Sequence, residues 1–139
     1  MSTTRKIILL ILALPLLSSC SNPEISEVCT GIFITHTLTV LTPEGEPADS
    51  VQITVSNKET GNEYDVCNPT ICDEPPRSNP YVIFHDGFSE KVDSDGEEII
   101  VRGTKGDKGF TEQFTFRDDG CHIRKVAGPD SVYLQVNKS

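Results

Sequence analysis

Three histidines are the side chains of this sequence best suited to proton transfer near neutral pH, because the ordinary pKa of imidazole lies there. His36 falls on the apolar side of an alternating segment, which predicts a histidine in the core or at its rim. His85 directly precedes Asp86, and neighbouring residues of a strand point to opposite faces, which is poor geometry for a catalytic pair. His122 follows Cys121, whose sulfur is neither a nucleophile nor a metal ligand if it forms a disulfide. We therefore expect no catalytic residue.

Two acidic turns offer the carboxylate oxygens that calcium favours. They are DSDGEE, residues 93–98, and RDDG, residues 117–120. The first lacks a third acidic or Asn ligand before its glycine, and Thr104 stands where an EF-hand has its last ligand. The sequence also has no Gly-x-Ser-x-Gly, no His-Glu-x-x-His and no phosphate-binding glycine loop. We expect both turns to be solvated, without a metal ion, and the chain to bind no cofactor.

The first twenty residues have the layout of an export signal. A positive pair, Arg5 and Lys6, precedes an apolar run over residues 7–17. That run is too short to cross a bilayer, because a spanning helix needs about 20 apolar residues. It ends in LSSC, residues 17–20, which resembles the bacterial lipobox. The resemblance implies that Cys20 carries lipid on its thiol and begins the mature protein; the alternative is a plain secretory signal with a chance cysteine.

The lipobox divides the chain into a signal peptide over residues 1–19, a lipidated N-terminus and short linker over 20–28, and one domain over 29–139. Removing the signal peptide takes away two of the 12 basic residues and none of the 21 acidic ones, so ten basic residues remain and the net charge is −11. That acidity argues against nucleic acid and against a lysine-rich contact with anionic lipid. Membrane attachment then depends on acyl chains such as palmitate, and two or more suffice for stable anchoring.

Four cysteines remain once the first is assigned to lipid. An exported protein can form disulfides, and an even number favours them. We favour Cys67 with Cys72, which closes the loop CNPTIC, and Cys29 with Cys121, which joins an early segment to a late one. The other pairings stay open. A zinc site of thiols and His122 is a further alternative, although no two ligand pairs stand at zinc-finger spacing.

The rest of the chain alternates apolar and polar residues in short runs, the period-two pattern of half-buried β-strands. The clearest runs are residues 31–41 and 50–56, which the turn TPEGEP separates. Further strands are expected within residues 81–87, over 88–103 on both sides of an SDGE turn, and within 110–120, 121–128 and 131–136. No segment after Cys20 shows sustained helical periodicity. The expected fold is an all-β, Greek-key sandwich of about seven or eight strands.

Three stretches resemble carboxypeptidase regulatory-like and transthyretin-like domains. They are LTVLTPEGEPADSVQITVSNKETGNEY at residues 38–64, VDSDGEEIIVRGTKGDKGFTEQFTF at 92–116 and DGCHIRKVAGPDSVYLQV at 119–136. The resemblance implies a Greek-key β-sandwich that serves adhesion, assembly or support of a neighbour. One enzyme of the transthyretin fold, 5-hydroxyisourate hydrolase, has a hallmark Tyr-Arg-Gly-Ser ending that residues 134–139 lack, so the resemblance carries no catalytic site with it.

We expect a lipid-anchored protein of the bacterial cell envelope, at the outer membrane on its periplasmic face or at the cell surface. Its partners would be the membrane, through the acyl chains, and an envelope protein or glycan. One alternative is a small exported hydrolase or metal-dependent enzyme that uses His85, His122 and the acidic loops. Another is a polysaccharide-binding accessory protein, which the absence of Trp and the presence of only three Tyr disfavour.

Overall fold

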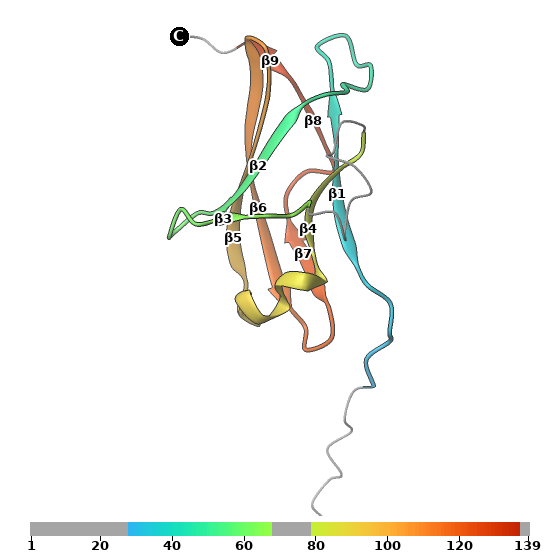
Figure 1. The fold of residues 1–139 in the computed structure, drawn as a ribbon, viewed down its shortest axis with the longest axis vertical. Helices are drawn as coiled ribbons and strands as arrows, with labels where there is room; N and C mark the ends of the chain where they lie inside the picture. The colour runs from blue at the N-terminus through green and yellow to red at the C-terminus, as the bar shows by residue number, and fades with distance from the viewer. Residues whose placement is uncertain (1–27, 68–78, 137–139) are drawn as a thin grey trace, which may run out of the picture.

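The computed structural model describes residues 28–67 and 79–136, and these form two β-sheets packed face to face (Figure 1). The predicted signal peptide and the lipidation site Cys20 lie outside the described residues. In the part of the chain that the structure describes, no helix is long and apolar enough to span a membrane. The all-β sandwich that the sequence predicts is confirmed.

The strands are β1 Thr35–Leu41, β2 Gln52–Asn57, β3 Glu63–Tyr64, β4 Tyr81–His85, β5 Glu97–Lys105, β6 Lys108–Asp118, β7 Ile123–Ala127, β8 Ser131–Tyr133 and β9 Gln135–Val136, and one 3-10 helix, η1, spans Asp86–Lys91. The smaller sheet has the order β4-β1-β8 and the larger the order β3-β2-β5-β6-β7, with β9 paired to β6. Paired strands are antiparallel except β1 and β8, which are parallel. Among the described residues there are nine strands, of which β3 and β9 have only two residues each.

Period-two alternation decides which side chains of β1 face the core. Leu38 and Val40 are buried between the sheets, whereas Thr35 is exposed. Ile32 is expected on the same apolar face, but it precedes the strand and is exposed. The reason is that the pairing of β1 with β4 ends at Thr35 and His85, so the chain before that point has left the sheet.

One predicted strand is wrong, because residues 88–92 belong to η1 and its C-terminal cap rather than to a strand before the SDGE turn. The helix is capped by His85, whose Nδ1 accepts the backbone N–H of Gly87 at 3.0 Å. The ring of Phe88 is buried and stacks on Phe84, with 5.1 Å between the ring centroids. The cap and the buried ring together stabilise a short helix where the chain crosses from the smaller sheet to the larger.

Aromatic rings from both sheets meet in the core. Phe84 of β4 stacks on Phe116 of β6 with 4.6 Å between ring centroids, and Phe114 of β6 is also fully buried. Tyr81 is buried too, and its hydroxyl donates to the carbonyl oxygen of Ala48 at 2.7 Å. Leaving a buried hydroxyl without a partner costs roughly 1–3 kcal/mol, so this bond removes a penalty from the core.

Candidate functional site

Asp86, the first residue of η1, binds groups from two distant segments of the chain. Its Oδ2 accepts the backbone N–H of Ile34 at 2.8 Å and lies 2.7 Å from Nδ1 of His122. Its Oδ1 accepts the backbone N–H of Ile123 at 2.8 Å. On the other side of the imidazole, Nε2 of His122 lies 3.0 Å from Oγ1 of Thr30. We name Thr30, Asp86 and His122 the Asp86 cluster.

A disulfide lies directly beside this cluster. Cys29 and Cys121 are bonded to each other, with 5.2 Å between their Cα atoms, and they precede Thr30 and His122 in the chain. The predicted pairing of these two cysteines is therefore confirmed, and both sulfurs are removed as zinc ligands. Among residues 28–67 and 79–136, no group of three or more His, Cys, Asp or Glu side chains converges as a metal site does.

Only one cysteine of the second predicted disulfide, Cys67, is among the described residues. Cys67 is disulfide-bonded. Its predicted partner, Cys72, lies outside the described residues, so the pairing of these two stays a prediction.

Burial and hydrogen bonding define the charge state of Asp86. Its side chain and that of His122 are 12% and 11% exposed. Burial alone would raise the pKa of Asp86, but the N–H groups of Ile34 and Ile123, together with His122, outweigh it and hold that pKa below the usual value. A carboxylate can only accept hydrogen bonds, so Nδ1 of His122 carries the proton of the bond to Asp86. The other ring nitrogen, Nε2, forms the hydrogen bond with the hydroxyl of Thr30. The cluster is thus a hydroxyl–imidazole–carboxylate chain, the arrangement that activates a nucleophile in hydrolases.

A shallow pocket of about 240 Å³ lies beside the cluster and the disulfide, lined by Val28, Cys29, Thr30, Asp119, Cys121, His122 and Arg124. Asp119 is the acidic residue of this lining. The carboxylate accepts a hydrogen bond from Arg124 and accepts the backbone N–H groups of His122 and Cys121, and these contacts lower its pKa well below the usual range. The N–H of Gly120 is likewise donated to Asp118.

These contacts bear on what the pocket can do chemically. An acyl-transfer site needs backbone N–H donors aimed at a developing oxyanion. In the turn that carries His122, three successive N–H groups, those of Gly120, Cys121 and His122, are bound instead by aspartate side chains. These three N–H groups therefore fix the shape of the turn and are not directed at a bound oxyanion.

The other two histidines have structural surroundings. His36 is partly buried as expected: its Nε2 donates to the carbonyl oxygen of Ile123 at 2.9 Å, and its ring lies on Phe116. His85 is buried and stacks on Phe88 with 4.5 Å between ring centroids. Burial lowers the pKa of His85, although the charges of Asp86 and a second aspartate oppose the shift.

Carboxylates of both acidic segments are bonded to other groups of the protein. In the first, Glu98 forms a 2.9 Å ion pair with Lys58, and Glu97 accepts a hydrogen bond from Asn57. In the second, Asp118 and Asp119 bind the backbone and Arg124, as described above.

Sequence reasoning missed the Asp86 cluster. One part of the cluster could have been inferred from the sequence. The favoured pairing of Cys29 with Cys121 brings the residues that follow each cysteine, Thr30 and His122, close together. Nothing comparable marks Asp86, which lies 36 residues from His122 in sequence. Its neighbour His85, the obvious partner from the sequence, faces Phe88 instead.

Comparison of the chain with family models, with curated proteins and with solved structures gave no match.

Proposed function

We propose that the protein is a lipid-anchored β-sandwich of the bacterial cell envelope, which binds or supports an envelope protein or glycan without catalysis. The observation that carries the proposal is where the disulfide and the Asp86 cluster lie. The disulfide joins residues 29–34, the segment through which the chain enters the sandwich, to the turn before β7, and the Asp86 cluster joins the same segment to η1 and to that turn. The proposed lipid anchor, Cys20, precedes this segment by nine residues in the sequence.

Such a join suits a tethered domain for a mechanical reason. A pull from the membrane reaches the domain through the residues before β1, which is the central strand of the smaller sheet. Without the join, the load would fall on the backbone hydrogen bonds between β1 and its two neighbours. With it, the load passes first into a covalent bond and into the buried hydrogen bonds of Asp86.

The anchor is tested by replacing Cys20 with alanine. We expect the wild-type chain to enter the detergent phase of a Triton X-114 partition and to incorporate labelled palmitate, because the acyl chains supply the membrane affinity. The Cys20→Ala variant should enter the aqueous phase without label, while its circular dichroism spectrum stays unchanged. Recovery of Cys20→Ala in the detergent phase would contradict the proposed lipid anchor.

The Asp86 cluster supports one second candidate, a hydrolase in which Thr30 attacks and His122 accepts its proton. Turnover of an activated ester by the wild-type chain, reduced 100-fold or more in both Thr30→Val and His122→Gln, would favour it, since a positioned general base contributes roughly 10²–10⁴-fold. Val136→Ala, a change at an exposed side chain of β9, serves as the control. We expect no saturable turnover in any of the three variants or in the wild type.

A further inference from the structure

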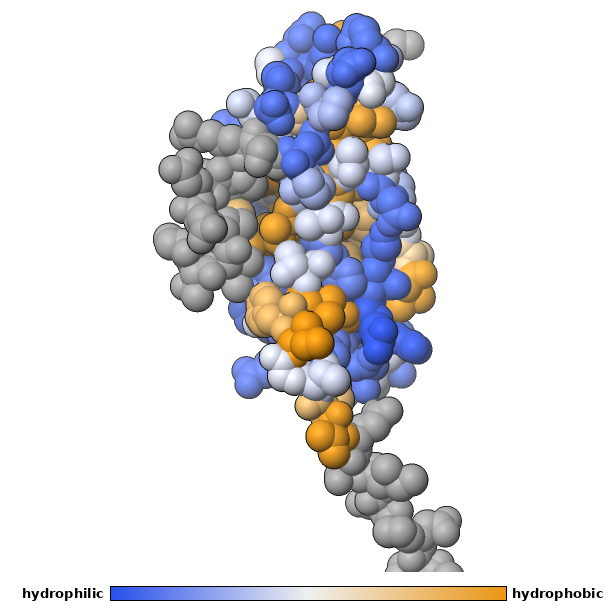
Figure 2. All heavy atoms as spheres, turned by 90° about the vertical axis from the view of Figure 1, so that its right-hand side faces the viewer, coloured by the Kyte–Doolittle hydropathy of each residue, from blue (hydrophilic) through white to orange (hydrophobic). Residues whose placement is uncertain are grey.

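Three exposed apolar side chains lie on the short segment that precedes β1. Val28 is 91% exposed, Ile32 65% and Phe33 51%. Figure 2 shows hydrophobic atoms at the end of the molecule where the described chain begins. We name Val28, Ile32 and Phe33 the apolar cap. Exposed apolar side chains are ordinary when scattered, but a group at one end marks a contact surface.

The cap is held in place rather than free to fold inward. The Cys29–Cys121 disulfide fixes it on one side, and the bond from Ile34 N–H to Asp86 fixes it on the other. The ring of Phe33 packs against His85 with 5.4 Å between ring centroids, so half of the ring is supported while the other half stays exposed. A contact that uses these side chains therefore loses little conformational entropy.

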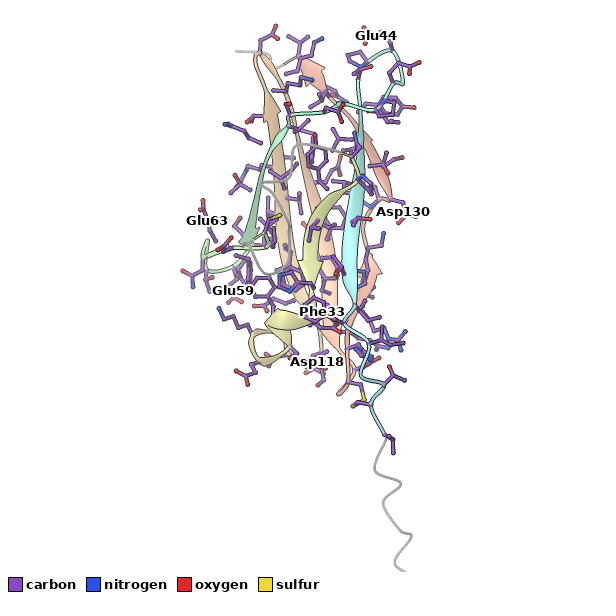
Figure 3. All side chains as sticks on the ribbon, turned by 45° about the vertical axis from the view of Figure 1, so that its right-hand side comes forward. Phe33, Glu44, Glu59, Glu63, Asp118 and Asp130 are labelled. Carbon is purple, nitrogen blue, oxygen red and sulfur yellow. A yellow bond between two sulfur atoms is a disulfide. The ribbon has the colours of Figure 1, made fainter. Side chains whose placement is uncertain are left out.

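The position of the cap indicates what covers it. The eight residues 21–28 reach at most roughly 30 Å when extended, so an acylated Cys20 keeps the cap close to a bilayer. Residues 28–33 carry no charge, although the chain as a whole is acidic. The acidic turn with Glu44 lies at the opposite end of the domain, whereas Phe33 and Asp118 lie at the end where the described chain begins (Figure 3).

We propose that the apolar cap inserts into the interfacial layer of the membrane that holds Cys20, with the domain standing on this end. The inference rests on the proposed lipid anchor. Apolar and aromatic side chains gain free energy by burial at that depth, and this gain needs no positive charge. The lipid anchor would then position the domain as well as retain it, with the Glu44 end directed away from the membrane.

Fluorescence quenching tests the contact directly, because the chain has no Trp of its own. Phe33→Trp places one fluorophore in the cap, and Val136→Trp places a matched one at an exposed position of β9, at the far end of the domain (Figure 1). The acylated full-length variants are reconstituted in phosphatidylcholine vesicles with and without brominated chains. We expect brominated lipid to reduce the emission of Phe33→Trp at least twofold and to leave Val136→Trp unchanged.

The other outcomes of this experiment distinguish failure of the lipid anchor from failure of the apolar cap. If the acylated chain does not float with vesicles, the anchor fails and the inference with it. If it floats but the two variants are quenched equally or not at all, only the apolar cap is overturned. Shielding of Phe33→Trp from acrylamide in native envelopes, without quenching by brominated lipid, would instead identify a protein partner and overturn it too. Ile32→Trp replaces Phe33→Trp if loss of the contact with His85 unfolds the domain.

Discussion

His85 and Asp86 are neighbours in sequence, yet the fold favours the neutral form of His85 and the charged form of Asp86. The imidazole of His85 lies among the rings of Phe33 and Phe88, where burial disfavours its charged form. The carboxylate of Asp86 is also largely buried, but two backbone N–H groups and His122 stabilise its charge. Hydrogen-bond donors, rather than depth of burial, account for the difference.

The neutral state of His85 predicts sensitivity to mild acid. Its pKa is lowered in the folded state, so the folded form binds fewer protons than the unfolded chain, whose histidine pKa is about 6.5. This contribution to stability is complete above pH 6.5 and is lost as the pH falls below that value toward the lowered pKa. We expect the melting temperature to fall in that window, and His85→Asn, which keeps an acceptor for the N–H of Gly87, to reduce the fall. An equal fall in both proteins would contradict the prediction.

Replacing Asp86 by asparagine, a change of nearly the same shape, should strongly lower the free energy of unfolding. Asp86→Asn keeps the shape but turns an N–H group toward one of the backbone donors of Ile34 or Ile123, and it removes the charge that faces His122. We expect a loss of about 3 kcal/mol in the free energy of unfolding, measured with urea. Thr30→Val removes only the outermost bond of the cluster and should cost about 1 kcal/mol or less. Equal losses in the two variants would show that the carboxylate has no special role.

At the scale of elements, close contacts between strands depend on glycine. Gly128, just after β7, has a φ of 121°, and a Cβ there would lie 2.2 Å from the ring of Phe114 on β6. Gly103 of β5 pairs directly with Phe110 of β6, whose ring covers it in the same way. These glycines let aromatic rings of β6 lie flat against neighbouring backbone.

Gly128→Ala should therefore destabilise the sandwich by about 3 kcal/mol, because it combines a strained φ with a clash against a fully buried ring. Gly106→Ala is the matched control: Gly106 also has a positive φ, of 62°, but nothing lies within 4 Å of the added carbon. That control should cost about 1 kcal/mol. Chemical denaturation measures both, and a similar loss in the two variants would mean that the Phe114 ring moves aside freely.

At the scale of the whole molecule, one disulfide joins the segment before β1 to the turn before β7. Cys29 and Cys121 are separated by 92 residues, so their bond restricts nearly the entire unfolded chain. Together with the Asp86 cluster, it gathers the entry segment, η1 and the turn before β7 at one end of the sandwich (Figure 1).

The Cys29→Ala, Cys121→Ala double variant removes that disulfide. Its free energy of unfolding should be lower by about 4–5 kcal/mol, because the unfolded chain is then no longer restricted by the bond. Replacing Cys67 and Cys72 together, which would open only a short predicted loop, should cost about 2 kcal/mol. Non-reducing peptide mapping of the wild type checks the pairing first. Free thiols at Cys29 and Cys121 would contradict it.

The sequence by itself determined the fold class and favoured, among three possible pairings, the disulfide that the structure shows. Alternation with a period of two decides which side chains of a strand are buried, and that is a local property, as Leu38 and Val40 show. Four cysteines follow Cys20, and because Cys67 and Cys72 stand close together in the loop CNPTIC, Cys29 with Cys121 is the favoured second pair, which the structure shows.

Only the tertiary structure decided where the chain turns helical and which polar groups meet. The segment after His85 forms a helix because a side-chain cap and a buried ring favour it, and neither leaves a mark in periodicity. Thr30, Asp86 and His122 come from three segments far apart in sequence, and their contact depends on how the two sheets pack. The same packing leaves Ile32 and Phe33 beyond the end of the sheet, where the alternating pattern predicts burial for Ile32 and the structure exposes both.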